Sequence, residues 1–266
     1  MKKFILFKLF KHTIRHLLRI ISRITGNGKL PDFVIIGAQK SGTKSVRYYL
    51  NQHPEINMVS RESKFFNNDK KFQKGLKWYK SLFYNNNKLQ GDDTPEYIAS
   101  FKSHERMKTI IPNAKLILIL RDPVYRAYSG YNHFKQLKNK SSFYLPNDNF
   151  VNNILEEQKN NFNKGFIQRG FYIDQIEHLL KFYRREQLLI LINEEMRKNP
   201  EETYNKIFNF LELKKIKMEF NRIIHSMEYL VEPLTNEAIE IMLKIYKPYN
   251  ERLYKFLGYE IQDWLK

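Results

Sequence analysis

Residues 33–50, FVIIGAQKSGTKSVRYYL, constrain the fold more than any other stretch of this sequence. They combine a short apolar run rich in β-branched residues, a turn bounded by Gly37 and Gly42, and a segment with helical spacing of apolar residues. Such a run is typical of a central parallel strand, and glycines permit backbone angles that other residues rarely adopt. The N–H groups of the turn then converge at a helix N-terminus, so we predict a site for a phosphate-like anion.

The spacing of Gly37 and Gly42 matches the start of a Walker A loop, but the next residues do not. That motif continues with lysine and then serine or threonine, whereas residues 42–44 read Gly-Thr-Lys. Another lysine, Lys40, lies inside the loop. We therefore expect an anion site that works without a metal. The structural alternative is an ordinary strand-to-helix turn with exposed lysines.

Composition limits the partners without choosing among them. The 266 residues carry a formal net charge of +18, which implies a nucleotide, an acidic glycan, nucleic acid or a membrane surface as partner. Cysteine is absent, which excludes a disulfide framework and suits a reducing compartment, so we expect a cytoplasmic location. Only His12 and His16 have the spacing of metal ligands, and they lie in a basic segment, so we expect no metal site.

Residues 1–28 form a predicted basic amphipathic helix that precedes a single domain over residues 29–266. Apolar residues fill much of the helix surface, and basic residues recur three or four positions apart on one face: Lys8, Lys11, Arg15, Arg19 and Arg23. A spanning helix needs about 20 predominantly apolar residues, and these cations interrupt the segment. We expect residues 1–25 to bind an anionic membrane surface peripherally, at its inner face; packing on the domain's own surface is the alternative.

A second strand is predicted at Lys115–Leu120, KLILIL, and it ends at Arg121 before a helix that contains Ser129. Ligands of open α/β sheets bind at the carboxyl ends of the strands. Two strand-to-helix anion sites on one sheet indicate a ligand with two separated anionic groups, such as a nucleotide with 5′ and 3′ substituents.

Glu62 lies in the segment RESKFF, residues 61–66, between two cations. We interpret this carboxylate either as a positioned general base or as a residue of a solvated turn. Further along the chain we predict a turn at residues 91–95. We also predict a strand at residues 188–192, reached by a right-handed crossover. Helices are predicted at residues 150–157, 172–183, 201–211 and 235–257, and the last is interrupted at Pro248.

Five segments, in the same order, resemble the sulfotransferases that use 3′-phosphoadenosine 5′-phosphosulfate (PAPS), especially the heparan-sulfate-type and bacterial carbohydrate enzymes. Residues 37–45, GAQKSGTKS, resemble the family's 5′-phosphosulfate loop, and residues 120–129, LRDPVYRAYS, its 3′-phosphate element. Residues 61–66 are similar to the segment with the catalytic glutamate. Residues 169–175, RGFYIDQ, and 247–253, KPYNERL, resemble later signatures.

The resemblance implies an α/β fold with one P-loop-like domain and a central, mainly parallel sheet flanked by helices. It implies transfer of a sulfuryl group from PAPS, without a metal, to a hydroxyl or amine of a carbohydrate or glycolipid. Glu62 and Lys40 are then the catalytic residues. The expected nucleotide-binding residues are Lys40, Ser41, Gly42, Thr43, Lys44, Ser45, Arg121, Ser129, Gly170 and Tyr172.

Two positions and one segment depart from the family pattern. Lys64 replaces a histidine that usually follows the catalytic glutamate, and Asp93 replaces a lysine often found in a Gly-Glu-Lys-Thr-Pro turn. Residues 226–234 lack the cysteine and the basic cluster of the C-terminal loop in heparan-sulfate enzymes. Lys64 then either favours the ionised form of the base or contacts an anionic acceptor. His133 and Asp92 are the substitute bases if Glu62 does not serve.

Two other classes remain as alternatives at this stage. A P-loop kinase or related phosphotransferase shares the strand-loop-helix but requires the Walker lysine and acidic Mg²⁺ ligands. A non-catalytic basic protein that binds acidic polymers or membranes accounts for the charge alone. Nucleic acid is not favoured as a partner, and the sequence does not determine the oligomeric state.

Overall fold

A computed structural model describes residues 28–136, 149–161, 165–220 and 233–265 of the chain. The predicted helix over residues 1–28 therefore lies almost wholly outside the described residues. At the centre is a five-stranded sheet in the order β2-β3-β1-β4-β5, and every pairing in it is parallel. The strands are β1 (Phe33–Gly37), β2 (Ile56–Met58), β3 (Leu89–Asp93), β4 (Lys115–Leu120) and β5 (Leu188–Ile192).

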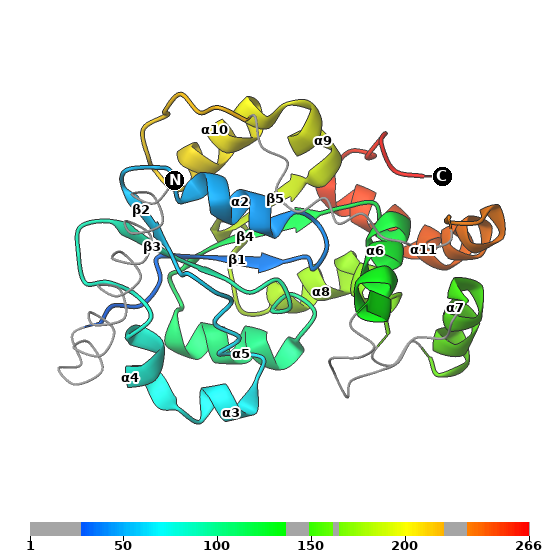
Figure 1. Cartoon of the computed structure of the whole chain (residues 1–266), viewed down its shortest axis with the longest axis horizontal. Helices are drawn as coiled ribbons and strands as arrows, with labels where there is room; N and C mark the ends of the chain where they lie inside the picture. The colour runs from blue at the N-terminus through cyan, green and yellow to red at the C-terminus, as the bar shows by residue number, and fades with distance from the viewer. Residues whose placement is uncertain (1–27, 137–148, 162–164, 221–232, 266) are drawn as a thin grey trace, which may run out of the picture.

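Helices cover both faces of this sheet (Figure 1). One face carries α2 (Thr43–Leu50) and α10 (Pro200–Phe210), with α9 (Asn193–Lys198) directly after β5. The other face carries α5 (Phe101–Ile110) and α8 (Tyr172–Leu179). Two short helices, α3 (Asp69–Phe72) and α4 (Gly75–Lys80), lie next to α5 in Figure 1.

A third group of helices packs beside one end of the sheet. It contains α6 (Pro123–Gln136), α7 (Phe150–Lys159) and α11 (Asn236–Leu257), together with the 3₁₀ turn η1 (Gln168–Gly170). A second 3₁₀ turn, η2 (Arg185–Gln187), leads into β5. No helix in the described part of the chain is long and apolar enough to cross a membrane.

The strands β1 and β4 are buried because they are apolar on both sides, as the sequence predicts. Alternate side chains enter different cores: Phe33 and Ile35 pack under α2 and α10, whereas Val34 and Ile36 pack on the side of α5 and α8. Covering both faces in this way requires apolar residues at consecutive positions of a strand. The predicted α/β class with a parallel sheet is confirmed.

Two sequence-based expectations need correction. The turn predicted at residues 91–95 begins later, because Gly91, Asp92 and Asp93 are the last residues of β3, paired with β1. Polar residues at the end of a buried strand hid it from a pattern based on apolar runs. The second correction is that α11 continues through Pro248. Buried Tyr246 and Leu253 hold the helix on both sides of the proline.

Candidate active site

The anion loop connects β1 to α2 and has the backbone that its glycines predict. Gly42 has φ 92° and Lys40 has φ 71°, both in the left-handed region. A side chain at Gly42 would bring a Cβ atom within 2.7 Å of Asn193 Nδ2. Asn193, the first residue of α9, donates through Nδ2 to the Ser41 carbonyl over 3.0 Å. The sequence did not single out Asn193, because its contact with the loop crosses about 150 residues of chain.

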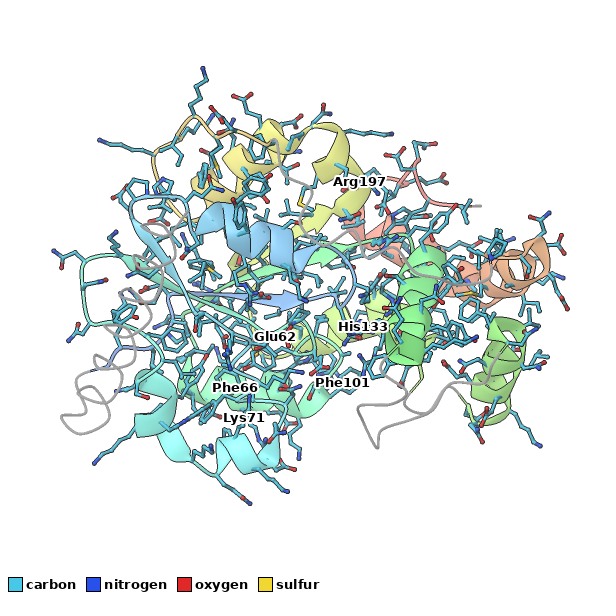
Figure 2. The ribbon with its side chains drawn as sticks, viewed as in Figure 1. Glu62, Phe66, Lys71, Phe101, His133 and Arg197 are labelled. Atoms are coloured by element: carbon cyan, nitrogen blue, oxygen red, sulfur yellow. The ribbon has the colours of Figure 1, made fainter. Side chains whose placement is uncertain are left out.

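His133 lies on α6 (Figure 2), within electrostatic reach of Lys40 and Lys44. Burial, followed by the charges of Lys40 and Lys44, lowers the pKa of His133 to about 4. His133 Nδ1 is buried and has no hydrogen-bond partner among the described residues. The imidazole is therefore neutral near pH 7.

Arg121 joins the second predicted anion element to the first. It follows β4, and its Nη1 donates to the Lys40 carbonyl over 3.1 Å. Burial lowers the pKa of Arg121. The Arg121 carbonyl in turn accepts a 2.8 Å hydrogen bond from the Tyr172 hydroxyl. Ser129 is buried on α6, the helix that Arg121 precedes.

Gly170 and Tyr172 lie beneath this region rather than on its surface. Both are buried, and a Cβ atom at Gly170 would lie 2.7 Å from the Tyr246 ring. Burial raises the pKa of Tyr172 to about 12, so its hydroxyl remains a donor to the Arg121 carbonyl. Tyr172 therefore supports Arg121, and Gly170 leaves room for the Tyr246 ring.

The start of α6 is held in place by residues near the C-terminal end of the described chain. Asp122 caps α6, because its Oδ1 accepts hydrogen bonds from the Val124 and Tyr125 amides at 2.8 and 3.1 Å. Its Oδ2 accepts from the Leu265 amide over 2.8 Å. Trp264 Nε1 donates to Glu194, whose other oxygen accepts from the Asp122 amide. The C-terminal segment therefore fixes the start of α6.

Glu62 lies in the loop after β2, and Lys64 holds its carboxylate. Lys64 Nζ is 3.4 Å from Glu62 Oε2 and 3.4 Å from Glu96 Oε2. Burial lowers the pKa of Lys64, but the Glu96 and Glu62 carboxylates outweigh it, and the net shift is upward. Lys64 has φ 51°, an uncommon angle for a residue with a side chain. Of the two contacts suggested for Lys64, with Glu62 or with an anionic acceptor, this geometry shows the one with Glu62.

Asp92 anchors this loop from inside the protein. Its Oδ2 accepts from Ser63 Oγ at 2.6 Å, from the Tyr79 hydroxyl at 3.0 Å and from the Tyr97 hydroxyl at 3.3 Å. Asp92 is fully buried. An acceptor hydroxyl cannot reach a carboxylate in this environment, so Asp92 is a structural residue and not the substitute base that the sequence suggested.

Asp93 faces the other side of β3. Its Oδ2 forms an ion pair with Arg47 Nη1 of α2 at 3.2 Å, and its side chain is 0% exposed. Burial raises the pKa of Asp93 to about 7, although Arg47 opposes the shift. Arg47 was not singled out from the sequence; its position one helical turn after Lys44 was the available signal.

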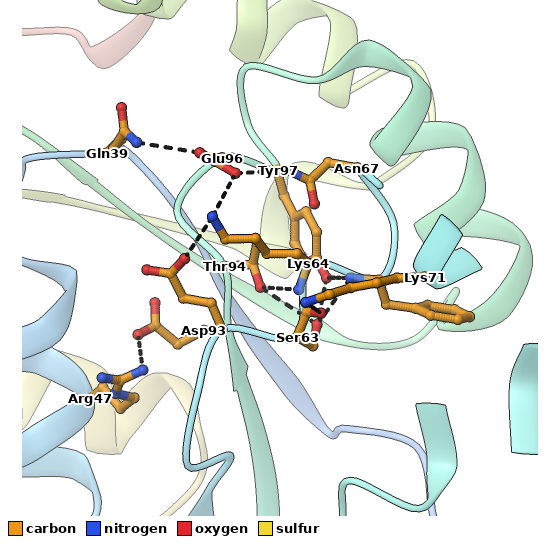
Figure 3. Close-up of polar contacts among 12 residues, drawn as sticks. Gln39, Arg47, Ser63, Lys64, Asn67, Lys71, Asp93, Thr94, Glu96 and Tyr97 are labelled. Atoms are coloured by element: carbon orange, nitrogen blue, oxygen red, sulfur yellow. Dashed lines mark hydrogen bonds and ion pairs between the residues drawn. The ribbon is translucent and has the colours of Figure 1, made fainter. Parts of the chain in front are cut away.

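A row of polar contacts links the base segment to the anion loop (Figure 3). Glu96, which pairs with Lys64, also accepts from Gln39 Nε2 over 3.3 Å. Arg169 donates to Gln39 Oε1. Gln39 belongs to the loop between β1 and α2, so this loop and the loop that carries Glu62 share one network. Among the described residues, no cluster of three or more His, Asp or Glu side chains has the geometry of a metal site.

The fold and these residues define a nucleotide-binding α/β protein of the P-loop type, with a modified anion loop after β1, a second anion element after β4 and a carboxylate in the loop after β2. The model of the family described as "Sulfotransferase domain" matches residues 30–231. The chain belongs to the sulfotransferase family.

Curated relatives include carbohydrate sulfotransferases. Human heparan sulfate glucosamine 3-O-sulfotransferase 3B1 is 26% identical over 262 residues, covering 89% of this chain and 65% of the relative. The membrane-associated sulfotransferase kil1 of Dictyostelium discoideum is 25% identical, covering 86% of this chain and 65% of the relative. The chain thus spans just under two thirds of the length of these relatives.

Solved structures share the fold at low sequence identity. A sulfotransferase from Alicyclobacillus acidocaldarius has a TM-score of 0.68 at 20% identity, covering 89% of this chain and 99% of that chain. Mouse sulfotransferase SULT7A1, complexed with PAP, has a TM-score of 0.57 at 14% identity, covering 92% and 95% of the two chains.

Proposed function

We propose that this chain transfers the sulfuryl group of PAPS to a hydroxyl or amine of an acceptor. The observation that carries the proposal is the contact between Arg121 and the Lys40 carbonyl. It brings together two anion-binding elements at the carboxyl ends of neighbouring strands, as a nucleotide with a 5′-phosphosulfate and a 3′-phosphate requires. Glu62 lies in the loop at the end of β2, the position for an acceptor.

The nucleotide is held by groups of different kinds. The amides of residues 41–45 and the Lys40 and Lys44 side chains suit the 5′-phosphosulfate, because helix N-termini and lysines favour anions. Arg121 and Ser129 suit the 3′-phosphate. Gly170 and Tyr172 act from beneath, by packing and by the hydrogen bond to the Arg121 carbonyl.

The chemical step is an in-line displacement at sulfur. The acceptor oxygen or nitrogen forms a bond to sulfur while the bond from sulfur to the bridging oxygen of the phosphosulfate breaks, and that oxygen keeps the electron pair. Glu62 takes the proton of the acceptor group. Lys40 and the loop amides stabilise the charge that grows on the bridging oxygen, so this step needs no metal.

A carbohydrate or glycolipid is the proposed acceptor. The relatives named for heparan sulfate support a carbohydrate. A cluster of cations lies beside Glu62: burial, and then the charges of Lys64 and Lys74, lower the pKa of Lys71. Cations held this close together favour an acceptor with anionic or strongly polar groups.

We also propose a peripheral membrane association through residues 1–25, in the cytoplasm. The proposal depends on the basic and apolar pattern of that segment. Deleting residues 2–25 should weaken binding to vesicles that contain anionic lipid and leave binding to neutral vesicles unchanged. Equal binding of the full and truncated chains to anionic vesicles would refute the association.

The transfer proposal is tested by nucleotide binding and by product analysis. Calorimetry should show binding of adenosine 3′,5′-bisphosphate (PAP) without Mg²⁺, and Mg²⁺–ATP should compete poorly. Mass spectrometry should detect sulfated products when PAPS is supplied with carbohydrate extracts. A phosphotransferase would show the opposite nucleotide preference, and a non-catalytic basic protein would bind PAP only weakly and with steep salt dependence.

A further inference from the structure

Asn193 contacts the anion loop from the end of β5. It is the first residue of α9, directly after β5, and it is 8% exposed. Its Nδ2 donates to the Ser41 carbonyl over 3.0 Å. A carbonyl only accepts hydrogen bonds, so this contact fixes which end of the Asn193 amide faces the loop. A Cβ atom at Gly42 would lie 2.7 Å from the same Nδ2, so this nitrogen lies against the peptide between Ser41 and Gly42.

The ends of β4 and β5 hold two consecutive carbonyls of the loop. The last residues of these strands are partners in the sheet register, so Arg121 and Asn193, which follow them, leave the sheet at the same level. Arg121 donates to the Lys40 carbonyl, and Asn193 donates to the next carbonyl, that of Ser41. The backbone of the anion loop is therefore held from two neighbouring strands.

The contact with Asn193 sets the direction of one backbone amide. The peptide bond between Ser41 and Gly42 is trans, and the C=O and N–H groups of a trans peptide point in opposite directions. Since the Ser41 carbonyl faces Asn193, the Gly42 N–H faces away from it. The N–H of Ser41 itself donates inside the loop, to the Ala38 carbonyl over 3.1 Å. Asn193 thus controls the peptide that carries the next amide, that of Gly42.

Gly42 is also the residue at which α2 begins. A glycine has no side chain to cap a helix, so the amides at the start of α2 remain for a ligand. Gly42 has φ 92°, and Asn193 Nδ2 occupies the space that a side chain at this position would need. The local structure therefore depends on both residues, a glycine without a side chain and an asparagine with a donor.

We propose that Asn193 is a positioning residue that directs the Gly42 amide toward the 5′-phosphate group of the nucleotide. The proposal rests on the proposed sulfuryl transfer, in which the amides of this loop bind the 5′-phosphosulfate. Asn193 acts through the loop backbone and needs no contact with the nucleotide. A leucine of similar size would fill the same space without a donor. The peptide could then rotate and turn its carbonyl, instead of its N–H, toward the anion.

The first experiment measures the binding of three ligands by calorimetry, which are PAP, adenosine 5′-monophosphate and adenosine 3′-monophosphate. Asn193→Leu should weaken PAP and the 5′-monophosphate by about 10–100-fold, the equivalent of one lost hydrogen bond to a charged group. Binding of the 3′-monophosphate should stay unchanged, because it lacks the 5′ group. Asn199→Leu is the matched control, since Asn199 is exposed at the other end of α9.

The second experiment observes the Gly42 amide directly by NMR. The chain has ten glycines, so labelling glycine with ¹⁵N gives few signals, and that of Gly42 is assigned by its loss in Gly42→Ala. Saturating PAP should displace the Gly42 signal in the wild type and in Asn199→Leu. In Asn193→Leu the displacement at saturating PAP should be much smaller. A role of Asn193 in stability alone would leave this displacement unchanged.

Equal weakening of all three ligands, unchanged affinities, or an equal displacement of the Gly42 signal would overturn the proposal. Asn193→Ala removes the donor with a smaller side chain and should give the same pattern where leucine disturbs α9. A wild-type chain that binds PAP, together with Asn193 variants that bind all three ligands as the wild type does, would overturn this inference alone. A wild-type chain that does not bind PAP would overturn the proposed function and this inference with it.

Discussion

Arg121 Nη1 donates a 3.1 Å hydrogen bond to the carbonyl of Lys40 and so joins two loops separated by 81 positions in the sequence. The first loop follows β1 and the second follows β4, and these strands are neighbours in the sheet. The two loops are therefore close enough for one ligand to contact both. This relationship makes the two ends of a nucleotide separately testable.

Replacing Arg121 should distinguish nucleotides with and without a 3′-phosphate. Arg121→Ala should weaken the binding of PAP by about 1.5–3 kcal/mol, the cost of a lost charge-assisted contact. It should weaken the binding of adenosine 5′-monophosphate much less. Calorimetry with both nucleotides measures the difference. Arg184→Ala is a control, since Arg184 lies before β5, at the amino ends of the strands, whereas Arg121 follows the carboxyl end of β4. Equal weakening of both nucleotides by Arg121→Ala would contradict the assignment.

Glu62 should affect turnover and leave nucleotide binding unchanged. Glu62→Gln should lower the rate of sulfuryl transfer by roughly 10²–10⁴-fold, the usual contribution of a general base, because no carboxylate then accepts the proton of the acceptor group. PAP affinity, measured by calorimetry, should stay the same. A folded Glu62→Gln protein with near-normal transfer at saturating acceptor would move the base elsewhere, and His133 would be the next residue to test.

Lys40 should affect binding and turnover together. It faces charge that is present on the bound phosphosulfate and that increases on the leaving oxygen. Lys40→Ala should therefore weaken the binding of PAP and also slow sulfuryl transfer at saturating PAPS. Stopped-flow binding and steady-state rates on one preparation give both quantities. A loss confined to affinity would show that Lys40 binds the ground state alone.

Asp93 should make the fold less stable at alkaline pH. Burial raises its pKa from 3.8 to about 7, so the folded state binds this proton more tightly than the unfolded chain. That stabilisation is complete below about pH 4 and is lost as the pH rises through 7. Asp93→Asn should exceed the wild type in free energy of unfolding by up to about 4 kcal/mol at pH 8, with a narrowing difference toward pH 4. The free energies of unfolding are measured by urea denaturation at several pH values. A difference between variant and wild type that stays constant with pH would refute this prediction.

His104 should have the opposite pH dependence. It is buried, its Nδ1 lies 2.9 Å from His178 Nδ1, and burial, then the charge of His178, lowers its pKa from 6.5 to about 4. A lowered pKa favours the neutral form in the folded state, so its contribution is present above pH 6.5 and is lost as the pH falls through 4. His104→Gln should reduce the acid-induced loss of stability by up to about 3 kcal/mol. An equal loss of unfolding free energy in variant and wild type between pH 7 and pH 4 would contradict this prediction.

Contiguous features were predictable from the sequence. The loop at residues 37–45 could be recognised because a strand, two glycines and a helix start follow one another, and backbone preferences act over just such short distances. The apolar runs of β1 and β4 identified the centre of the sheet for a similar reason, because strands buried on both faces need apolar residues throughout, and the run of β5 identified the strand at its edge. β2 was missed because three residues are too few for a periodic signal.

Pairings between distant residues were decided by the tertiary structure. The sequence marked Glu62, Lys64 and Asp93 as unusual, but only the folded chain brings Glu96 to Lys64 and Arg47 to Asp93. Whether a carboxylate is exposed, paired or buried depends on which strand and helix lie against it, and neighbouring residues in the chain do not carry that information. The sequence by itself therefore determined the anion loop and the class of chemistry, while the charge environment of each carboxyl group was fixed by packing.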